Sequence, residues 1–424
     1  MGFNFDVTAA TATLKSRYTD LKIQTLAYKS KLLARMPKDP TYGGQDYRGT
    51  IRFATTTAVS ALDTIAYTVG NASQYSQWVV PWKDHYASAN ITGGAIDRSK
   101  GDANALVNDL TGEFDGMFVS LGVALGWQLY GNGGGALGQI SSGSTVGSVT
   151  ITLANISNVT NFQVGMILQA SVDDGTGGGG LRSAGATITL TGVDRTLGTL
   201  TAAGNWSASI AAIVAGDFLF QNGNYNACFP GLSGWLPAPA YTTANGTVIA
   251  SKRPIGGDNF LSVNRFPDPI RLAGGYFQGN GAPKEETVLQ LAMLVQREGG
   301  TPNVMACNPA DAVDVIKALE SRTIYQNPGT DTSPTVGFEG FKIATAGGMI
   351  EVVQDPFCPQ GIFYLLQLDT WLLPSIGKIP RVFGKGIDEL EWLRNAGADS
   401  YQLRGGFRVG SYCSAPGWNG VGTF

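Results

Sequence analysis

Apolar side chains recur every three or four residues in two long stretches of this chain, which is the spacing of an α-helix. The first stretch covers residues 13–36, and its opposite face is basic. The second covers residues 97–130 and is the strongest helical pattern in the sequence. A helix of about 30 residues would be roughly 45 Å long, so we expect the second helix to be the element around which the rest is arranged.

Two segments with alternating apolar positions lie between these helices, around residues 49–57 and 77–86. Ile51 and Phe53 share one face of the first segment, and Trp78, Val80 and Trp82 share one face of the second. The pattern predicts a long two-stranded hairpin. Because an isolated hairpin is marginally stable in water, we expect these five side chains to pack on a neighbouring subunit.

A change in composition marks the middle of the chain. After the glycine-rich residues 131–138, Thr, Val, Ile and Gly dominate as far as residue 226, and residues 186–201 have the pattern of a hairpin. We predict a small β-barrel or sandwich, with the loop 173–180 (DDGTGGGG) as a mobile surface tip.

Mixed elements follow this segment. Residues 284–297 and 308–319 are predicted to form amphipathic helices, the second with Asn308 as its N-cap. Residues 350–353, 362–366 and 400–411 have strand patterns.

Composition points to large contacts between subunits. Charged residues make up 14% of the chain, whereas about 25% is typical of soluble domains. A surface with so few charges is suited to burial against other protein. The net charge of −3 argues against a general nucleic-acid binder. The four cysteines are far apart in the sequence and are expected to be buried free thiols.

Few residues suggest chemistry. His85 is the only histidine, so a triad or a histidine metal cluster would have to be built around it alone. We interpret it as an arm residue at a contact surface. The pair Asp173 and Asp174 lacks the spaced ligands of a calcium loop. We therefore predict no catalytic, cofactor-binding or metal-binding residues, no enzymatic activity and no membrane-spanning segment.

The order of these elements resembles one family. A basic helix, a long hairpin, a very long helix, a glycine-rich break and a mixed lobe closing in strands succeed one another in the major capsid proteins of tailed bacteriophages, which have the Hong Kong 97-type fold. Residues 229–232 (FPGL), 305–311 (MACNPAD) and 359–366 (PQGIFYLL), with Asp369, are also similar to that family. The resemblance implies an α+β fold with an additional all-β inserted domain.

The resemblance also implies domain boundaries. Residues 1–42 would be the N-terminal arm, 43–95 the E-loop and 96–135 the spine helix of the peripheral domain. Residues 136–226 would be the inserted β domain, 227–370 the axial domain, and 371–424 the closing strands of the axial and peripheral domains.

The resemblance implies a structural role in a shell. Copies of the chain would form the pentamers and hexamers of an icosahedral shell around double-stranded DNA, assembled in the host cytoplasm and located in the virion. Scaffolding, portal and cement proteins are the expected partners. Ile51, Phe53, Trp78, Val80 and Trp82 are the predicted contacts between subunits. Lys15, Lys22, Lys29 and Arg35 on the first helix are candidates for non-specific contact with the packaged DNA, with a solvated face or pairing to acidic neighbours as the alternative.

Two other functions stay open on the sequence. The first is the shell of an encapsulin-like bacterial compartment, which resembles the same fold and holds protein cargo. The second, from another class, is a β-rich glycan-binding or hydrolytic protein that uses the segment 136–226.

Overall fold

The computed structural model describes residues 30–41, 43–68, 70, 72–94, 109–238, 259–319, 342–345, 347–383, 393–394 and 397–424. The chain divides into two compact units. The described residues of the first unit fall within 86–121 and 380–406, and those of the second within 29–85, 122–379 and 407–424.

The first unit contains a small sheet and the beginning of the long helix. Strand β4 (Lys83–Thr92) pairs with β21 (Ser400–Val409), which also pairs with β19 (Arg381–Val382) and β20 (Leu393–Arg394). Helix α5 (Asp109–Tyr130) starts in this unit. A Cβ atom at Gly405 would lie 2.8 Å from Met117 Cε, so the helix packs closely on β21. The predicted helix at 97–130 is confirmed for residues 109–130, and residues 97–108 lie outside the described part.

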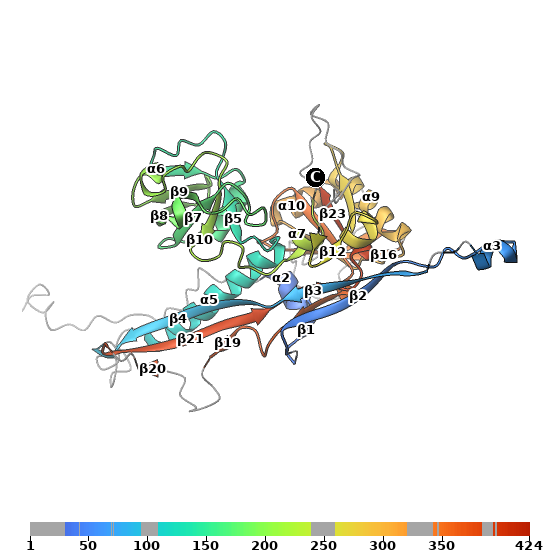
Figure 1. Ribbon diagram of the computed structural model, residues 1–424. Helices are drawn as coiled ribbons and strands as arrows, with labels where there is room; N and C mark the ends of the chain where they lie inside the picture. The colour runs from blue at the N-terminus through green and yellow to red at the C-terminus, as the bar shows by residue number, and fades with distance from the viewer. Residues whose placement is uncertain are drawn as a thin grey trace, which may run out of the picture. The chain divides into compact units, whose positions relative to one another are not determined.

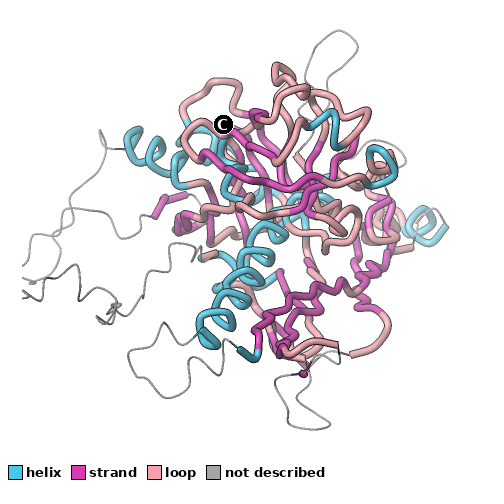
Figure 2. Tube along the Cα trace, turned by 90° about the vertical axis from the view of Figure 1, so that its left-hand side faces the viewer, coloured by secondary structure: helices cyan, strands magenta, loops and turns pink. Residues whose placement is uncertain are grey.

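The second unit is built on a six-stranded mixed sheet of order β13-β23-β17-β14-β16-β15. Its strands are β13 (Gly275–Gln278), β14 (Val304–Cys307), β15 (Lys342–Thr345), β16 (Gly348–Gln354), β17 (Ile362–Leu366) and β23 (Gly420–Thr423). Helices α9 (Lys284–Arg297) and α10 (Pro309–Leu319) pack on this sheet (Figures 1 and 2). Both predicted helices are confirmed, and Asn308 Oδ1 accepts a hydrogen bond from the Ala310 N–H.

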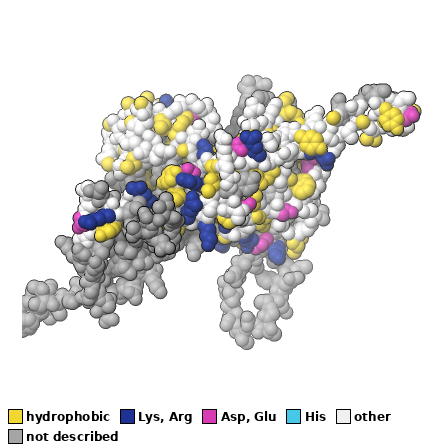
Figure 3. Space-filling model, turned by 60° about the horizontal axis from the view of Figure 1, so that its bottom comes forward, with side chains coloured by type: hydrophobic (Ala, Val, Ile, Leu, Met, Phe, Trp, Pro, Cys, Tyr) yellow, Lys and Arg dark blue, Asp and Glu magenta, His cyan; other side chains and the backbone are white. Residues whose placement is uncertain are grey.

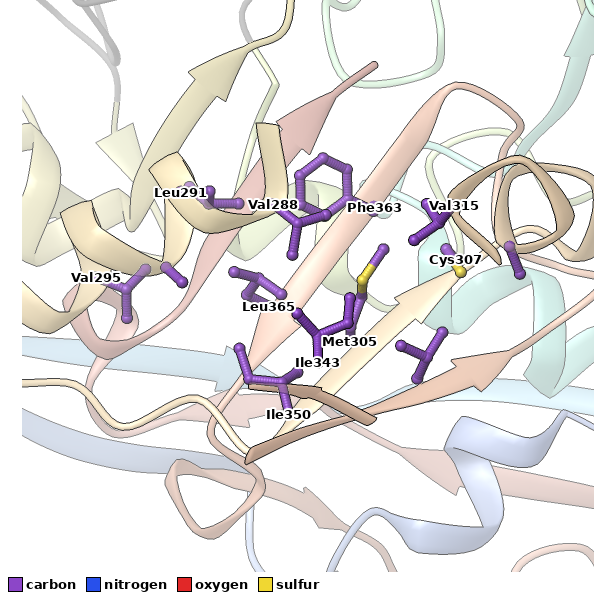
Figure 4. Packing of buried hydrophobic residues seen from close by; sticks show 13 residues of the cluster. Val288, Leu291, Val295, Met305, Cys307, Val315, Ile343, Ile350, Phe363 and Leu365 are labelled. Atoms are coloured by element: carbon purple, nitrogen blue, oxygen red, sulfur yellow. The ribbon is translucent and has the colours of Figure 1, made fainter. Parts of the chain in front are cut away.

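Apolar side chains of α9, α10 and the sheet form one core (Figure 4). Val288, Leu291 and Val295 recur along the inner face of α9, and each is fully buried. Phe363 and Leu365 point toward them from β17. The apolar face of the helix therefore packs on the apolar face of the strand, as the spacing of apolar residues in the sequence predicts.

Strand β23 was not predicted from the sequence. It pairs in parallel with β13 and antiparallel with β17, so the chain's last strand lies inside the sheet. Strands on both sides of residue 370 therefore belong to one sheet. Two glycines allow β23 to pack closely against its neighbours. A Cβ atom at Gly422 would overlap the Phe363 ring, and one at Gly420 would lie 2.9 Å from Leu291 Cδ1.

Residues 136–226 form an all-β lobe, on which Figure 1 labels β5, β7, β8, β9 and β10. Its six strands follow the order β5-β10-β7-β8-β9-β6. They are β5 (Ala136–Gln139), β6 (Thr150–Thr152), β7 (Ile167–Ser171), β8 (Ile188–Asp194), β9 (Thr199–Ala202) and β10 (Phe218–Gln221), with the short helices η1 (Ile156–Asn161), η2 (Arg182–Gly185) and α6 (Trp206–Ser209) between them. A bridge between Ile140 and Leu153 joins the two outermost strands, and the Ala154 N–H donates to the Gln139 carbonyl at 2.8 Å. The sheet is therefore closed into a small barrel, and the predicted hairpin at 186–201 is formed by β8 and β9.

The barrel begins and ends at one place. The Asn226 N–H donates to the Gly134 carbonyl at 2.8 Å, so the incoming and outgoing segments are directly hydrogen bonded.

The loop at 173–180, predicted as a mobile tip, is tied together by its first carboxylate. Asp173 accepts hydrogen bonds from the Gly175 and Gly179 N–H groups and from the Tyr225 hydroxyl.

The described N-terminal residues are attached to the sheet. The Ser30 hydroxyl donates to Asp355 at 2.5 Å and accepts from the Leu33 N–H, which caps helix α2 (Lys31–Arg35). Strand β1 (Lys38–Asp39) then pairs in parallel with β18 (Trp371–Pro374). The predicted single helix over 13–36 is wrong at Ser30, because its backbone is extended and its side chain starts a new helix.

Short elements complete the second unit: α7 (Leu232–Trp235), β11 (Asn259–Phe260), β12 (Val263–Asn264), α8 (Pro269–Ala273), η3 (Leu368–Thr370), β22 (Tyr412–Cys413) and η4 (Pro416–Trp418). The mixed content confirms the α+β class. Within the described residues, no helix combines the length and apolarity needed to cross a bilayer.

Candidate functional site

A two-stranded arm extends from the second unit. Strands β2 (Asp46–Ala54) and β3 (Gln74–Pro81) pair antiparallel from Asp46 opposite Pro81 to Ala54 opposite Gln74. The predicted second strand at 77–86 is divided in two, because β3 ends at Pro81 and β4 begins at Lys83. The arm therefore consists of β2, β3 and the residues between them, with helix α3 (Asp63–Thr68) at its far end (Figure 1).

An aromatic cluster holds the root of the arm. Trp78 is fully buried, with its ring centroid 5.0 Å from that of Trp235 and 6.1 Å from that of Phe260, both in edge contact. Trp235 also makes edge contacts with Trp371 and Tyr412. Large rings in such contacts contribute substantial burial and additional edge-to-face attraction.

The other strand of the arm meets the same cluster. The Tyr47 and Tyr412 rings lie 4.9 Å apart, and the Tyr412 ring occupies the space that a Cβ atom at Gly49 would fill. The Val79 N–H also donates to the Leu261 carbonyl at 3.0 Å. Both strands are thus fixed to the unit from which they extend.

This packing corrects part of the predicted set of subunit contacts. Trp78 and Val80 are completely buried and Ile51 is 8% exposed, so side chains of the same chain already cover them. The expectation that these three face a neighbouring subunit is wrong. Phe53 and Trp82 are half-buried, and their contact with another subunit stays a prediction.

The apolar surface of the arm lies instead at its outer end. Val59 is 85% exposed, Leu62 58% and Tyr67 86%. Figure 3 shows hydrophobic side chains gathered at this end, at the upper right. We call residues 55–73 the arm tip; Asp63 is its only charged residue. The signal was present in the sequence as apolar residues at helical spacing between two strands.

A hollow of about 400 Å³ lies beside the root of the arm. We call it the root hollow. It is lined by residues 50–55 of the arm, by Arg271 and Glu298, and by Ser414, Ala415, Gly417 and Trp418. Trp418 is 41% exposed, which is unusual for so large an apolar side chain.

The structure describes only one of the four residues that were predicted to face DNA, Arg35. Lys15, Lys22 and Lys29 lie outside the described residues. Arg35 donates to Glu351 at 2.7 Å, and both side chains are 40% exposed. The guanidinium of Arg35 lowers the pKa of the Glu351 carboxyl. Arg35 is therefore paired with an acidic neighbour, which is the alternative given above.

His85 does not lie at an exposed contact surface. Its ring stacks on Phe407 with centroids 5.1 Å apart, and its Nε2 lies 3.0 Å from Gln128 Nε2 and 3.9 Å from Cys228 Sγ. Burial lowers the pKa of His85 and raises the pKa of Cys228 to about 12. At neutral pH the thiol is protonated, so the pair does not supply an activated nucleophile.

The cysteines and the Asp173–Asp174 pair form no chemical site among the described residues. Cys228, Cys307, Cys358 and Cys413 are free and buried, as predicted. Asp174 accepts from Asn132 Nδ2 at 2.6 Å, and Asp173 accepts from the loop around it. In the part of the chain that the structure describes, no three acidic, histidine or cysteine side chains are grouped to hold a metal.

Comparison with solved structures gives a match over the whole chain. A chain of the cyanophage A-1(L) capsid asymmetric unit has 13% sequence identity and a TM-score of 0.54, with 99% of both chains covered. A chain of Microbacterium phage Oxtober96 has 12% identity and a TM-score of 0.47, with 99% of both covered. The SrpI encapsulin of Synechococcus elongatus PCC 7942 has 9% identity and a TM-score of 0.42, with 99% of this chain and 94% of the encapsulin covered.

The cyanophage similarity establishes a shared fold, and the two lower TM-scores add nothing to it. No protein-family model matches the sequence, and no curated protein does.

Proposed function

We propose that this chain, which has the fold of a phage capsid protein, is the major capsid protein of a tailed phage. Its copies would form the pentamers and hexamers of an icosahedral shell enclosing double-stranded DNA. The observation that carries the proposal is the combination of this fold over 99% of the chain with an arm whose apolar tip is exposed.

The exposed tip supports assembly on physical grounds. The tip carries three large apolar side chains, each more than half exposed, and only one charged residue. Such a surface is costly to leave in water, whereas aromatic and aliphatic side chains supply much of the binding energy of protein interfaces. Burial against another copy of the chain would remove that cost.

Partners beyond the shell follow from the same proposal. Scaffolding, portal and cement proteins would contact the assembled particle in the virion, and Lys15, Lys22 and Lys29 would meet DNA phosphates. Non-specific contacts of this kind weaken steeply with salt. Charge reversal at these three positions should lower the DNA content of particles without abolishing them.

Expression of the full chain followed by negative-stain electron microscopy tests the proposed function. We expect closed shells or rings of five and six subunits. A well-folded monomer at every concentration would contradict the proposal. The content of shells produced in the native host separates the two shell functions, since a capsid holds DNA and an encapsulin-like compartment holds protein.

A further inference from the structure

A cleft of about 290 Å³ lies where the barrel meets the end of helix α5. Its barrel wall includes residues of β5 and η1, and its other wall includes Trp127, Phe357 and Pro359. All of these residues belong to the second compact unit. We call this space the barrel cleft, and we propose that it binds a neutral sugar, one ring at a time. The proposal concerns binding by a single copy of the chain and does not depend on assembly.

Two connections between the barrel and the rest of the unit fix the walls of the cleft. The first is the stem of the barrel, where the Gly231 N–H donates to the Gly131 carbonyl at 3.0 Å. The stem is tightly packed, since a Cβ atom at Gly231 would overlap the Leu129 carbonyl oxygen. The second is the Gln360 N–H, which donates to the Ser157 hydroxyl of η1 at 3.3 Å. Because both connections already exist, the cleft is preformed, and a ligand loses little free energy to ordering of the protein.

Amide side chains dominate the polar lining of the barrel cleft: Asn132, Gln139, Asn155, Asn158 and Asn161. Two of them have unused hydrogen-bonding groups. Among the described residues, the half-buried Asn158 side chain has no hydrogen-bond partner, and Asn161 Oδ1 is buried without one. An amide holds donors and an acceptor in one plane, so it matches two neighbouring hydroxyl groups of a sugar. A ligand hydroxyl at Asn161 would also pair a buried oxygen that is costly to leave unpaired.

The charge of the lining argues against an anionic ligand. No Lys or Arg is found among the described residues that line the cleft, so a phosphate or carboxylate group would have no cation to pair with. The one charged lining residue is Asp174. Its carboxylate accepts from Asn132 Nδ2 at 2.6 Å and from the Thr176 N–H at 3.0 Å. This negative charge is therefore held in place, and it repels anions while leaving neutral hydroxyl groups unaffected.

Aromatic rings supply the apolar part of the lining. Trp127, Phe218 and Phe357 line the cleft together with the amides. A sugar ring has an apolar C–H face and a rim of hydroxyl groups, so a small cleft with aromatic rings and amides matches both of its surfaces. The volume of about 290 Å³ is near the lower limit of pockets that bind small molecules. It fits one sugar ring better than a peptide segment of several residues.

Saturation-transfer difference NMR on the full chain tests the proposal. The probes are the methyl glycosides of glucose, galactose, mannose and N-acetylglucosamine. We expect at least one of them to bind with a Kd on the order of 1 mM, in line with the binding free energy that so small a ligand reaches. Asn158→Ala should weaken this binding about ten-fold through the loss of its hydrogen bonds. The matched control is Asn222→Ala, which removes an exposed amide of the same barrel outside the cleft and should bind as the wild type does.

A second variant fills the cleft without removing an amide. Ala154 is an exposed lining residue, so Ala154→Phe should leave the circular dichroism spectrum unchanged and abolish sugar binding. Binding that survives Ala154→Phe, or that is equal in Asn158→Ala and Asn222→Ala, would show that the sugar does not bind in this cleft. No signal from any of the probes at about 20 mM, well above the expected Kd, would refute the site itself. Tighter binding of phosphorylated glucose or of the peptide probe acetyl-Gly-Gly-amide than of every neutral glycoside would overturn the class of ligand.

Discussion

At the scale of single residues, Trp78 has a different role from the one that its position in an alternating strand suggests. Alternation predicts that Trp78, Val80 and Trp82 share a face, but it gives no information on which surface covers that face. Trp235 and Phe260 do so, and they are more than 150 residues away in the sequence. No local pattern could have identified them, since the contact is made only by the tertiary fold.

Substitution of Trp78 distinguishes these two roles. Trp78→Ala should lower the free energy of unfolding of the unassembled subunit by about 3–5 kcal/mol, because it empties a fully buried site. Urea unfolding followed by circular dichroism measures the effect. Trp82→Ala is the matched control on the same segment; its side chain is half-buried, so its cost should be clearly smaller. Equal stability of wild type and Trp78→Ala would show that the aromatic cluster does not hold the arm.

At the scale of elements, the sequence was informative where one face of a helix or strand is buried. Helix α9 and strand β17 have the predicted bounds, because their apolar residues repeat at the period of the element. Strand β23 was missed because its sequence, Gly420-Val421-Gly422-Thr423, has only one apolar side chain in four residues. Its glycines are selected by close packing against Leu291 and Phe363, which a strand pattern does not reveal.

The Gly422→Ala variant tests the close packing of β23 against Phe363. The new methyl group would overlap the Phe363 ring, so the sheet or the ring must move. We expect a loss of about 1–3 kcal/mol in unfolding free energy, as is usual for overpacking. Thermal unfolding compares it with Gly143→Ala, where no atom lies within 4 Å of the added Cβ. A Gly422→Ala variant as stable as Gly143→Ala would mean that β23 does not pack in this way.

At the scale of the whole molecule, the chain enters and leaves the barrel formed by residues 136–226 at one place. The composition changes over this segment, and the hydrogen bond from the Asn226 N–H to the Gly134 carbonyl holds its two ends together. The chain leaves and returns at the same place, so the segment can have its own composition without altering the sheet around it.

Removal of the barrel is the corresponding test. Replacement of residues 136–225 by a short glycine linker should leave a folded protein, because the ends to be joined are already in contact. Circular dichroism and negative-stain microscopy should show retained secondary structure and retained shells. Separate expression of 136–226 should give a folded β-domain. Insoluble protein from both halves would indicate that the barrel and the sheet depend on each other for folding.

In the proposed shell, closure of the barrel would limit mispairing between neighbouring copies. A shell brings many identical chains to a very high local concentration, and a sheet with free edges would then recruit strands from its neighbours. The structure describes residues 136–226 without a gap. The bridge between Ile140 and Leu153 joins the two outermost strands of the sheet to each other, so the sheet is closed. In the proposed shell, strand exchange through this part of the surface would therefore be suppressed.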